Sequence, residues 1–324
     1  MDVAVVWDRR HRLPELPGAT TGAVELVTAA GRAVRSLPPA VFDAIVDLQD
    51  SPPRDGALLI RGVPVGDLPP TPAQPGDPVD KDRTSELVLL TVARALGQPV
   101  GYLPEHGGDL VQNLVPTVAG AERQVSTSSR VDLAFHTETA FHPHAPRYLV
   151  LLCLRGDPRA RTTLCSVHDV LEALDPDTVD VLRQLRFTCG VDESFLGGSG
   201  GSSTVSTVIT TTAGVEVRGP LPVIGGTSER PTFWYDADLM RGTDPAAQAA
   251  LDQLAVAVLE HQRSVVLAAG DCLVVDNTVA VHGRSAYEAR FDGTDRWLQR
   301  SFVVSDLAPS AAERDGRIIC TRFS

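Results

Sequence analysis

Three residues of this chain have the types and the spacing of a metal-binding site. His136 and Glu138 form a His-x-Glu triplet, and a second histidine, His282, lies far downstream. Two imidazoles and one carboxylate hold one face of an octahedral Fe(II) ion and leave the opposite face open to reactants. Alternate residues of a β-strand point to the same side, so His136 and Glu138 can reach one ion while Thr137 faces away. The spacing favours a catalytic iron centre, although such a triplet also occurs in segments that bind no metal.

The third ligand has to come from a strand that is distant in the sequence and adjacent in the sheet. Two consecutive strands are predicted at Val265–Leu267 and Cys272–Val275, and a turn follows at residues 276–277. His282 lies where the next strand would end. Arg296, fourteen residues beyond His282, can hold a carboxylate with two parallel hydrogen bonds at the open face of the metal.

Two segments around these residues resemble a known enzyme family. The first is Phe-His-Thr-Glu at residues 135–138. The second begins with Asp-Asn-x4-His-Gly-Arg at 276–284 and ends with Arg-Trp-Leu-Gln-Arg at 296–300. Together they resemble the clavaminate synthase-like branch of the Fe(II)/2-oxoglutarate-dependent oxygenases, which includes hydroxylases of free arginine and asparagine. The resemblance covers about residues 55–305.

The resemblance implies a mainly β protein with added helices and a double-stranded β-helix (jelly-roll) core. We expect one oxygenase domain over residues 1–324, with its core at about 55–305. The elements read from the sequence agree with a mixture of short strands and a few helices. They include a strand at Leu58–Ile60, a helix at Thr84–Leu96, a buried strand at Tyr148–Leu154, and a helix that begins at Asp244 and Pro245 and ends near His261.

The resemblance also implies a cofactor and two co-substrates. His136, Glu138 and His282 would hold Fe(II), with 2-oxoglutarate and O2 as co-substrates. Arg296 would bind the distal carboxylate of 2-oxoglutarate, and the Thr163 hydroxyl is a candidate partner for the same molecule. The expected reaction hydroxylates an unactivated carbon and releases succinate and CO2, while desaturation or cyclisation by the same chemistry stays open.

A second set of residues is implied for an amino-acid substrate. Arg300 would meet an α-carboxylate, and Glu138 could accept a hydrogen bond from an α-amine. Trp234 stands where the arginine-hydroxylating relatives carry a second acid, and an aromatic ring can stack on a cation but cannot replace that charge. Free arginine is therefore disfavoured, and a smaller or more apolar amino acid, or a modified, carrier-bound or cyclised derivative, is expected. The other predicted substrate-binding residues are Gln112, Ser126 and Asp236.

Two other classes of protein stay open. His142 and His144, close to the triplet, could build a histidine-rich zinc site, either hydrolytic or structural. A zinc site would need one of these histidines to retain its metal, whereas the oxygenase needs His282. A jelly roll that binds a ligand without catalysis is the third possibility, and it predicts no iron-dependent decarboxylation of 2-oxoglutarate.

Composition narrows the range of partners. The 324-residue chain has a net charge of −12 and no basic run, which argues against a nucleic-acid or anionic-membrane partner. No apolar stretch is long enough to cross a bilayer, and the five cysteines form no CxxC pair. We expect a cytoplasmic enzyme, monomeric or weakly dimeric, that acts on a small molecule. A Gly/Ser-rich loop at 197–203 could be a lid hinge or an exposed hairpin loop.

Overall fold

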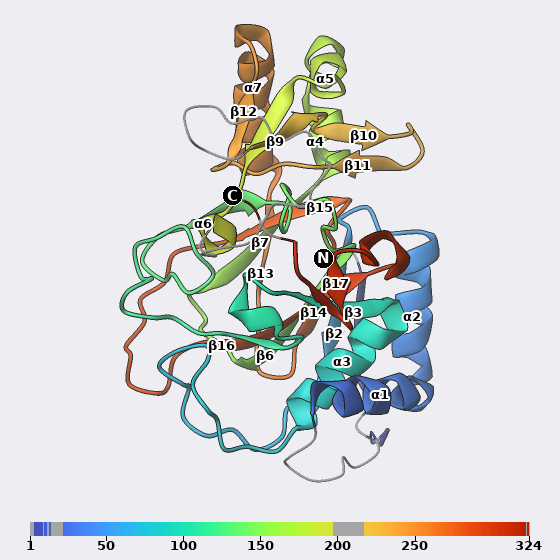
Figure 1. The fold of residues 1–324 in the computed structure, drawn as a ribbon, viewed down its shortest axis with the longest axis vertical. Helices are drawn as coiled ribbons and strands as arrows, with labels where there is room; N and C mark the ends of the chain where they lie inside the picture. The colour runs from blue at the N-terminus through green and yellow to red at the C-terminus, as the bar shows by residue number, and fades with distance from the viewer. Residues whose placement is uncertain are drawn as a thin grey trace.

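The protein is mainly β with added helices, as predicted (Figure 1). A computed structural model describes residues 3–8, 10–11, 13, 22–196, 217–321 and 323. The Gly/Ser-rich loop predicted at 197–203 lies outside these residues. None of the helices in the described ranges combines the length and the apolar character that a membrane span requires.

The largest sheet of the described chain has nine strands, and its centre uses the most apolar segments. β6 (Tyr148–Arg155) lies between β14 (Cys272–Asp276) and β16 (Trp297–Val304), and nearly all residues of these three strands are buried. Both faces of this centre must therefore be covered. The order is β1-β2-β14-β6-β16-β3-β18-β17 with β4 also paired to β16, the outer strands being β1 (Val3–Val6), β2 (Ala57–Arg61), β3 (Gln98–Tyr102), β4 (Gln112–Leu114), β17 (Arg314–Asp315) and β18 (Ile318–Ile319).

A smaller sheet of four described strands covers one face of the large sheet. Its order is β13 (Arg263–Val266), β7 (Arg161–Ser166), β15 (Ala280–Arg284) and β5 (Leu133–His136), and all its pairings are antiparallel. The inner faces of the two sheets meet in one hydrophobic cluster. Members of this cluster include Leu151 and Leu298 from the large sheet and Phe135 and Leu164 from the small one.

Helices cover the opposite face of the large sheet. α2 (Pro39–Asp50) and α3 (Thr84–Leu96) pack on β2, β6 and β14 in a second hydrophobic cluster, and α1 (Ala23–Ala33) packs on α3 (Figure 1). α3 has the bounds predicted from the sequence. Its buried residues cover most of its circumference because it lies between the sheet and α1.

A long helix and a group of short helices and strands lie at the top of Figure 1. α7 (Pro245–His261) begins as predicted, because the Asp244 side chain accepts hydrogen bonds from the N–H groups of Ala246 and Ala247. The other members are α4 (Val167–Ala173), α5 (Pro176–Leu182), β8 (Phe187–Gly190), β9 (Val217–Leu221), β10 (Ile224–Gly226), β11 (Pro231–Phe233) and β12 (Met240–Gly242). α6 (Glu193–Leu196) and three 3-10 turns, Val34–Ser36, His106–Gly108 and Ala308–Ser310, complete the described elements.

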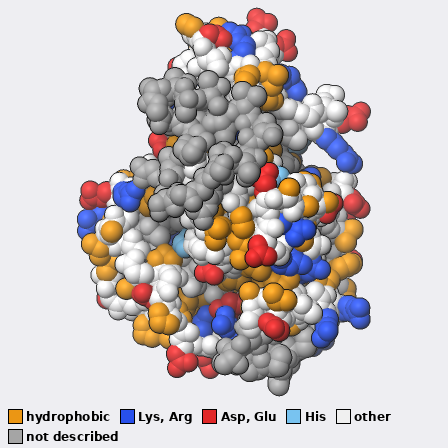
Figure 2. Space-filling view, in the orientation of Figure 1, with side chains coloured by type: hydrophobic (Ala, Val, Ile, Leu, Met, Phe, Trp, Pro, Cys, Tyr) orange, Lys and Arg blue, Asp and Glu red, His pale blue; other side chains and the backbone are white. Residues whose placement is uncertain are grey.

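Charged side chains of both signs are mixed over the face of the molecule in Figure 2. The described residues on this face form no continuous basic patch. On this face, the described residues of a chain with a net charge of −12 therefore offer no concentrated positive surface to a polyanion.

Candidate metal centre

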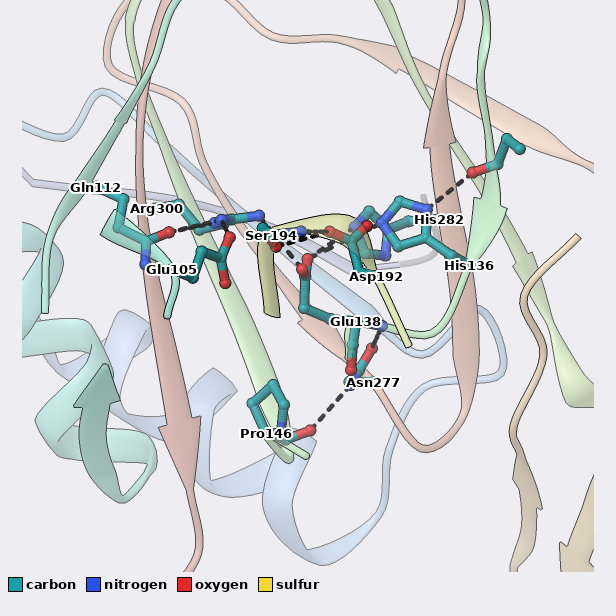
Figure 3. Close-up of polar contacts among 11 residues, drawn as sticks. Glu105, Gln112, His136, Glu138, Pro146, Asp192, Ser194, Asn277, His282 and Arg300 are labelled. Atoms are coloured by element: carbon teal, nitrogen blue, oxygen red, sulfur yellow. Dashed lines mark hydrogen bonds and ion pairs between the residues drawn. The ribbon is translucent and has the colours of Figure 1, made fainter. Parts of the chain in front are cut away.

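The structure brings the three predicted metal ligands together. One ligand atom from each of His136, Glu138 and His282 lies within 4.8 Å of the other two. The two histidines face each other across neighbouring strands β5 and β15, with ring centroids 4.3 Å apart (Figure 3). Glu138 Oε2 lies 3.5 Å from His282 Nε2 and 4.0 Å from His136 Nε2.

The backbone presents two of these ligands differently from the prediction. β5 ends at His136, and Thr137 donates its N–H to the Tyr235 carbonyl and lies buried in the turn that follows. The turn continues through Thr139, which has a positive φ of 50°. Glu138 therefore reaches the site from a turn and not through the alternation of a strand. The placement of His282 at a strand end was also wrong, because it lies in the middle of β15.

The turn is held by a residue that the sequence did not single out as functional. Asn277, which is fully buried, accepts a hydrogen bond from the Glu138 N–H at 2.8 Å. Its Nδ2 group donates to the carbonyls of Glu138 at 3.1 Å and Pro146 at 3.0 Å (Figure 3). Two of these bonds fix the backbone of Glu138 itself, and the third ties Asn277, which stands in the turn between β14 and β15, to the segment before β6. The only signal in the sequence was the Asp-Asn pair at a fixed distance before His282.

The protonation states of the triad fit a divalent metal ion. Burial alone would raise the pKa of Glu138, but Arg300 and the two histidines lower it to about 2, so the carboxylate is ionised. Burial lowers the pKa of His282 to about 4, which keeps its imidazole neutral. The His136 Nδ1 atom lies 2.8 Å from the Ala134 carbonyl; a proton shared there leaves Nε2 free to bind a metal.

Two buried atoms of the triad, Glu138 Oε2 and His282 Nδ1, have no hydrogen-bond partner among the described residues. Burying a carboxylate oxygen without a hydrogen bond costs free energy unless a cation lies beside it. The donor set of two imidazoles and one carboxylate oxygen is the one that Fe(II) oxygenases use, so the residues present fit this metal.

The triad lines a cavity of about 330 Å³ between the two sheets. Leu149, Leu151 and Leu298 form an apolar wall on the large sheet, and the smaller sheet with the turn after β5 supplies the opposite wall, which carries the predicted metal ligands. Ionisable side chains surround the remaining space, which is typical of a site for a small charged molecule. Besides the ligands they are Glu105, His106, Asp192, Asp236, Asp238, Arg284, Arg296 and Arg300.

Comparison with known proteins identifies the family. The profile described as taurine catabolism dioxygenase TauD, TfdA family matches residues 31–302. The chain belongs to the TauD/TfdA dioxygenase family. The predicted resemblance to its clavaminate synthase-like branch is confirmed, since clavaminate synthase 2 of Streptomyces clavuligerus is 33% identical over 316 residues, 95% of this chain and 92% of that enzyme.

Two further proteins similar to this dioxygenase are an amino-acid hydroxylase and an asparagine oxygenase of known structure. L-lysine 3-hydroxylase of Catenulispora acidiphila is 36% identical over 309 residues, 94% of this chain and 84% of that enzyme. The crystal structure of an asparagine oxygenase in complex with Fe(II), 2S,3S-3-hydroxyasparagine and succinate superposes with a TM-score of 0.86 and 34% identity. That similarity covers 98% of this chain and 99% of the other.

Of the two residues predicted to bind 2-oxoglutarate in this dioxygenase, one lines the cavity and the other does not. Arg296 is buried just before β16 and lines the cavity, and burial lowers the pKa of its guanidinium. Thr163 does not line the cavity: it pairs with Gly283, whose neighbours His282 and Arg284 point inward. Thr162, opposite Arg284 in the register, faces the cavity instead. The structure therefore does not support a contact of Thr163 with a molecule in the cavity, since adjacent strand residues point to opposite faces.

Arg300 is the centre of a buried polar network in the dioxygenase. Gln112 Oε1 accepts hydrogen bonds from Arg300 Nε at 2.9 Å and from Nη2 at 2.6 Å. Glu138 Oε1 accepts from Nη1 at 3.3 Å, and Glu105 pairs with Nη2 (Figure 3). Burial raises the pKa of Glu105 to about 7 although Arg300 opposes the shift. Gln112 lies behind Arg300 and outside the cavity lining, whereas Ser126 lies on that lining.

Of the predicted substrate-binding residues Trp234 and Asp236, only Asp236 lies on the described cavity wall. Asp236 lines the cavity, and its Oδ1 accepts hydrogen bonds from the N–H groups of Asp238 and Leu239. Burial raises the pKa of Asp236. Trp234 is half-buried and is not on the cavity lining that the described residues form, so the structure does not support its predicted contact with substrate. Asp238 lies on that lining instead.

His142 and His144, the histidines of the alternative zinc site, make contacts away from the triad. His142 Nδ1 accepts the N–H of His144 at 2.9 Å, and its ring packs among aromatic side chains that include Tyr102 and Phe195. Within the described ranges, the one group of side chains placed to hold a metal is the predicted triad, and it contains neither of these histidines. The structure therefore gives no support to a zinc centre built on His142 or His144.

Proposed function

We propose that this chain is an Fe(II)/2-oxoglutarate-dependent oxygenase that hydroxylates an unactivated carbon of an amino acid. The observation that carries the proposal is the His136–Glu138–His282 triad on a charged cavity. We further propose that the two facing sheets correspond to the two halves of a double-stranded β-helix, and that residues 1–324 form one domain. A cytoplasmic location and a monomeric or weakly dimeric state remain predictions from composition.

The chain would divide the cavity between co-substrate and substrate. Bound Fe(II), with 2-oxoglutarate and O2, supplies the oxidation that inserts one oxygen atom into a C–H bond and yields succinate and CO2. His136, Glu138 and His282 would hold the ion on one side only, which leaves room for both organic molecules. Arg296 and Thr162 would fix the distal carboxylate of 2-oxoglutarate. Both line the cavity, and Thr162 lies opposite Arg284, which is close enough to Arg296 for the two charges to interact.

The surroundings of Arg300 support a substrate with free α-amino and α-carboxylate groups. Its positive charge is already balanced by Glu105 and Glu138. An amino-acid zwitterion has no net charge in its α-groups, so it could exchange partners within this network without leaving a buried charge unpaired. The α-carboxylate would meet Arg300, and the α-ammonium group would meet Glu105 or the Oε1 atom of Glu138. A carrier-bound amino acid would lack the free α-carboxylate, and a cyclic dipeptide would lack both groups.

The side chain of the substrate would point towards Asp236 and Asp238. The expectation of an apolar substrate depended on Trp234, which does not line the described cavity. Two aspartates on the same wall favour a polar or cationic side chain instead. The lysine 3-hydroxylase and the asparagine oxygenase among the relatives agree with this range of side chains.

Succinate formation tests the proposal. Protein loaded with Fe(II) without oxygen would be mixed with 2-oxoglutarate, exposed to O2, and offered basic, amide and apolar amino acids one at a time. We expect succinate to rise with a polar or basic amino acid, and the product to gain one oxygen atom. Loss of two hydrogen atoms would identify the desaturation or cyclisation alternative. The His282→Ala protein is the control, and equal succinate from both proteins would refute the assigned centre.

A further inference from the structure

The three arginines on the cavity lining stand in two different electrostatic settings. Arg300 has two carboxylate partners, Glu105 and Glu138. Neither Arg284 nor Arg296 forms a salt bridge with any described residue. At one end of the cavity the arginine is therefore paired with carboxylates, whereas Arg284 and Arg296 at the other end have no anion paired with them among the described residues.

Arg284 belongs to the unbalanced end through its position on β15. It follows the metal ligand His282 by two residues, so both side chains point into the cavity. Thr162 on β7 lies directly opposite it. Only 5% of Arg284 is exposed, and this buried guanidinium lies with its central carbon 5.0 Å from the ring centroid of Tyr287.

Neutral groups hold the Arg284 guanidinium in place. Its Nη2 donates to Ser128 Oγ at 2.6 Å and its Nη1 donates to the Ser285 carbonyl at 3.1 Å, while a weaker contact reaches the Val131 carbonyl at 3.5 Å. These bonds fix the position of the cation but do not neutralise it. Burial and the nearby Arg296 lower the pKa of Arg284 to about 10, which still leaves it charged at neutral pH.

The acids nearest to this end have other partners. Asp132 accepts the N–H of Ala286, and Asp157 pairs with Arg159. Asp295, although adjacent in sequence to Arg296, accepts the N–H groups of residues 290 and 291. Two buried cations that repel each other are costly without an anion between or beside them. The co-substrate assigned to this end carries such an anion in its distal carboxylate.

We propose that Arg284 is a second cationic binding residue for the distal carboxylate of the 2-oxo acid, and that with Arg296 it makes the site select a dicarboxylate. The inference rests on the proposed function and deepens it. Arg296 would supply direct hydrogen bonds, and Arg284 would add attraction from the adjoining wall. Attraction between buried charges is strong because little water screens it.

A pair of ligands separates this role from a structural one. 2-Oxoglutarate and 2-oxovalerate share the 2-oxo acid group and the five-carbon chain, but only the first has a distal carboxylate. Dissociation constants for both would be measured under anaerobic conditions, by calorimetry and by the charge-transfer absorption of the Fe(II) complex. In Arg284→Gln we expect binding of 2-oxoglutarate to weaken about tenfold, with binding of 2-oxovalerate changed less than about twofold. Arg284→Lys, which keeps the charge, should retain most of the preference for 2-oxoglutarate.

Ser128→Ala is the matched control, because it removes a hydrogen bond of Arg284 and leaves the charge. The ratio of the two dissociation constants should stay at the wild-type value in this variant. Equal weakening of both ligands in Arg284→Gln, or no weakening of either, would overturn the inference. If wild-type protein gave neither heat nor absorption change with 2-oxoglutarate, the proposed function itself would fail, and the two failures are thereby distinguished.

Discussion

At the scale of single residues, the neighbouring threonines of β7 provide a direct test of the co-substrate pocket. Thr162 lines the cavity and Thr163 does not. Thr162→Val should weaken 2-oxoglutarate binding about threefold to tenfold, as expected for loss of one hydrogen bond to a charged group. Thr163→Val removes a hydroxyl one position away and should leave the affinity unchanged. Anaerobic titration measures both, and a reversed order would restore the assignment made from the sequence.

Asn277 provides a test of how the carboxylate ligand is positioned. Asn277→Asp has the same shape and keeps the acceptor for the Glu138 N–H, but it replaces the two Nδ2 donor bonds with oxygen facing two carbonyls. We expect weaker Fe(II) binding and more succinate per hydroxylated product, because Glu138 is held less firmly. Loss of buried donors costs about 1–3 kcal/mol, so the free energy of unfolding should fall as well.

A variant of the same turn shows whether stability alone explains such a result. Arg147 pairs with Asp276 next to Asn277, through bonds of 3.0 and 2.7 Å, and does not contact Glu138. Arg147→Met should lower the free energy of unfolding while the ratio of succinate to product stays at the wild-type value. An increase of that ratio in both variants would contradict a specific positioning role for Asn277.

At the scale of elements, the metal centre depends on how closely β5 and β15 approach. Gly283 lies between His282 and Arg284, and a Cβ atom at this position would lie 2.6 Å from the Leu133 carbonyl oxygen of β5. Gly283→Ala should therefore push the two strands apart and separate His136 from His282. We expect Fe(II) affinity to fall at least about tenfold, measured by competition with a chelating dye.

Gly190 on β8 is the matched control for this substitution. A Cβ atom there would lie 3.5 Å from the nearest atom, the Leu239 carbonyl oxygen, which is ordinary van der Waals contact. Gly190→Ala should bind Fe(II) like the wild type. If Gly283→Ala also bound Fe(II) normally, the two strands would have to tolerate separation, and the close approach would have no role in the centre.

At the scale of the whole molecule, metal binding should stabilise the fold. The three ligands come from two strands and a turn that are far apart in the sequence, so the complete set exists only in the folded chain. A metal that binds only the folded state stabilises it by about 2.7 kcal/mol at a hundred times its dissociation constant. The melting temperature should therefore rise with Mn(II), a redox-stable probe, in the wild type and stay constant in His282→Ala. An equal rise in both proteins would indicate binding elsewhere.

The sequence by itself determined the elements whose signals are local. α3 ends just before Gly97 and α7 begins just after Asp244, because helix-ending and capping residues act within one turn. β6 is a strand because its continuous apolar run suits burial on both faces. That His136, Glu138 and His282 come together could also be predicted, since the chemistry of Fe(II) restricts the residue types and the motifs around them are specific.

Only the tertiary structure decided which way the neighbouring side chains face. Thr162 and Thr163 are alike in sequence, and the pairing of β7 with β15 puts the first into the cavity. Trp234 was chosen from its alignment with an acid, but its half-buried position takes it off the described lining. The facing of the two threonines depends on strand register. Contacts between residues more than a hundred positions apart, such as Arg284 with Ser128, were likewise decided only by the fold. A linear pattern of residue types does not contain that information, and for the same reason the uneven charge of the cavity became visible only in the folded chain.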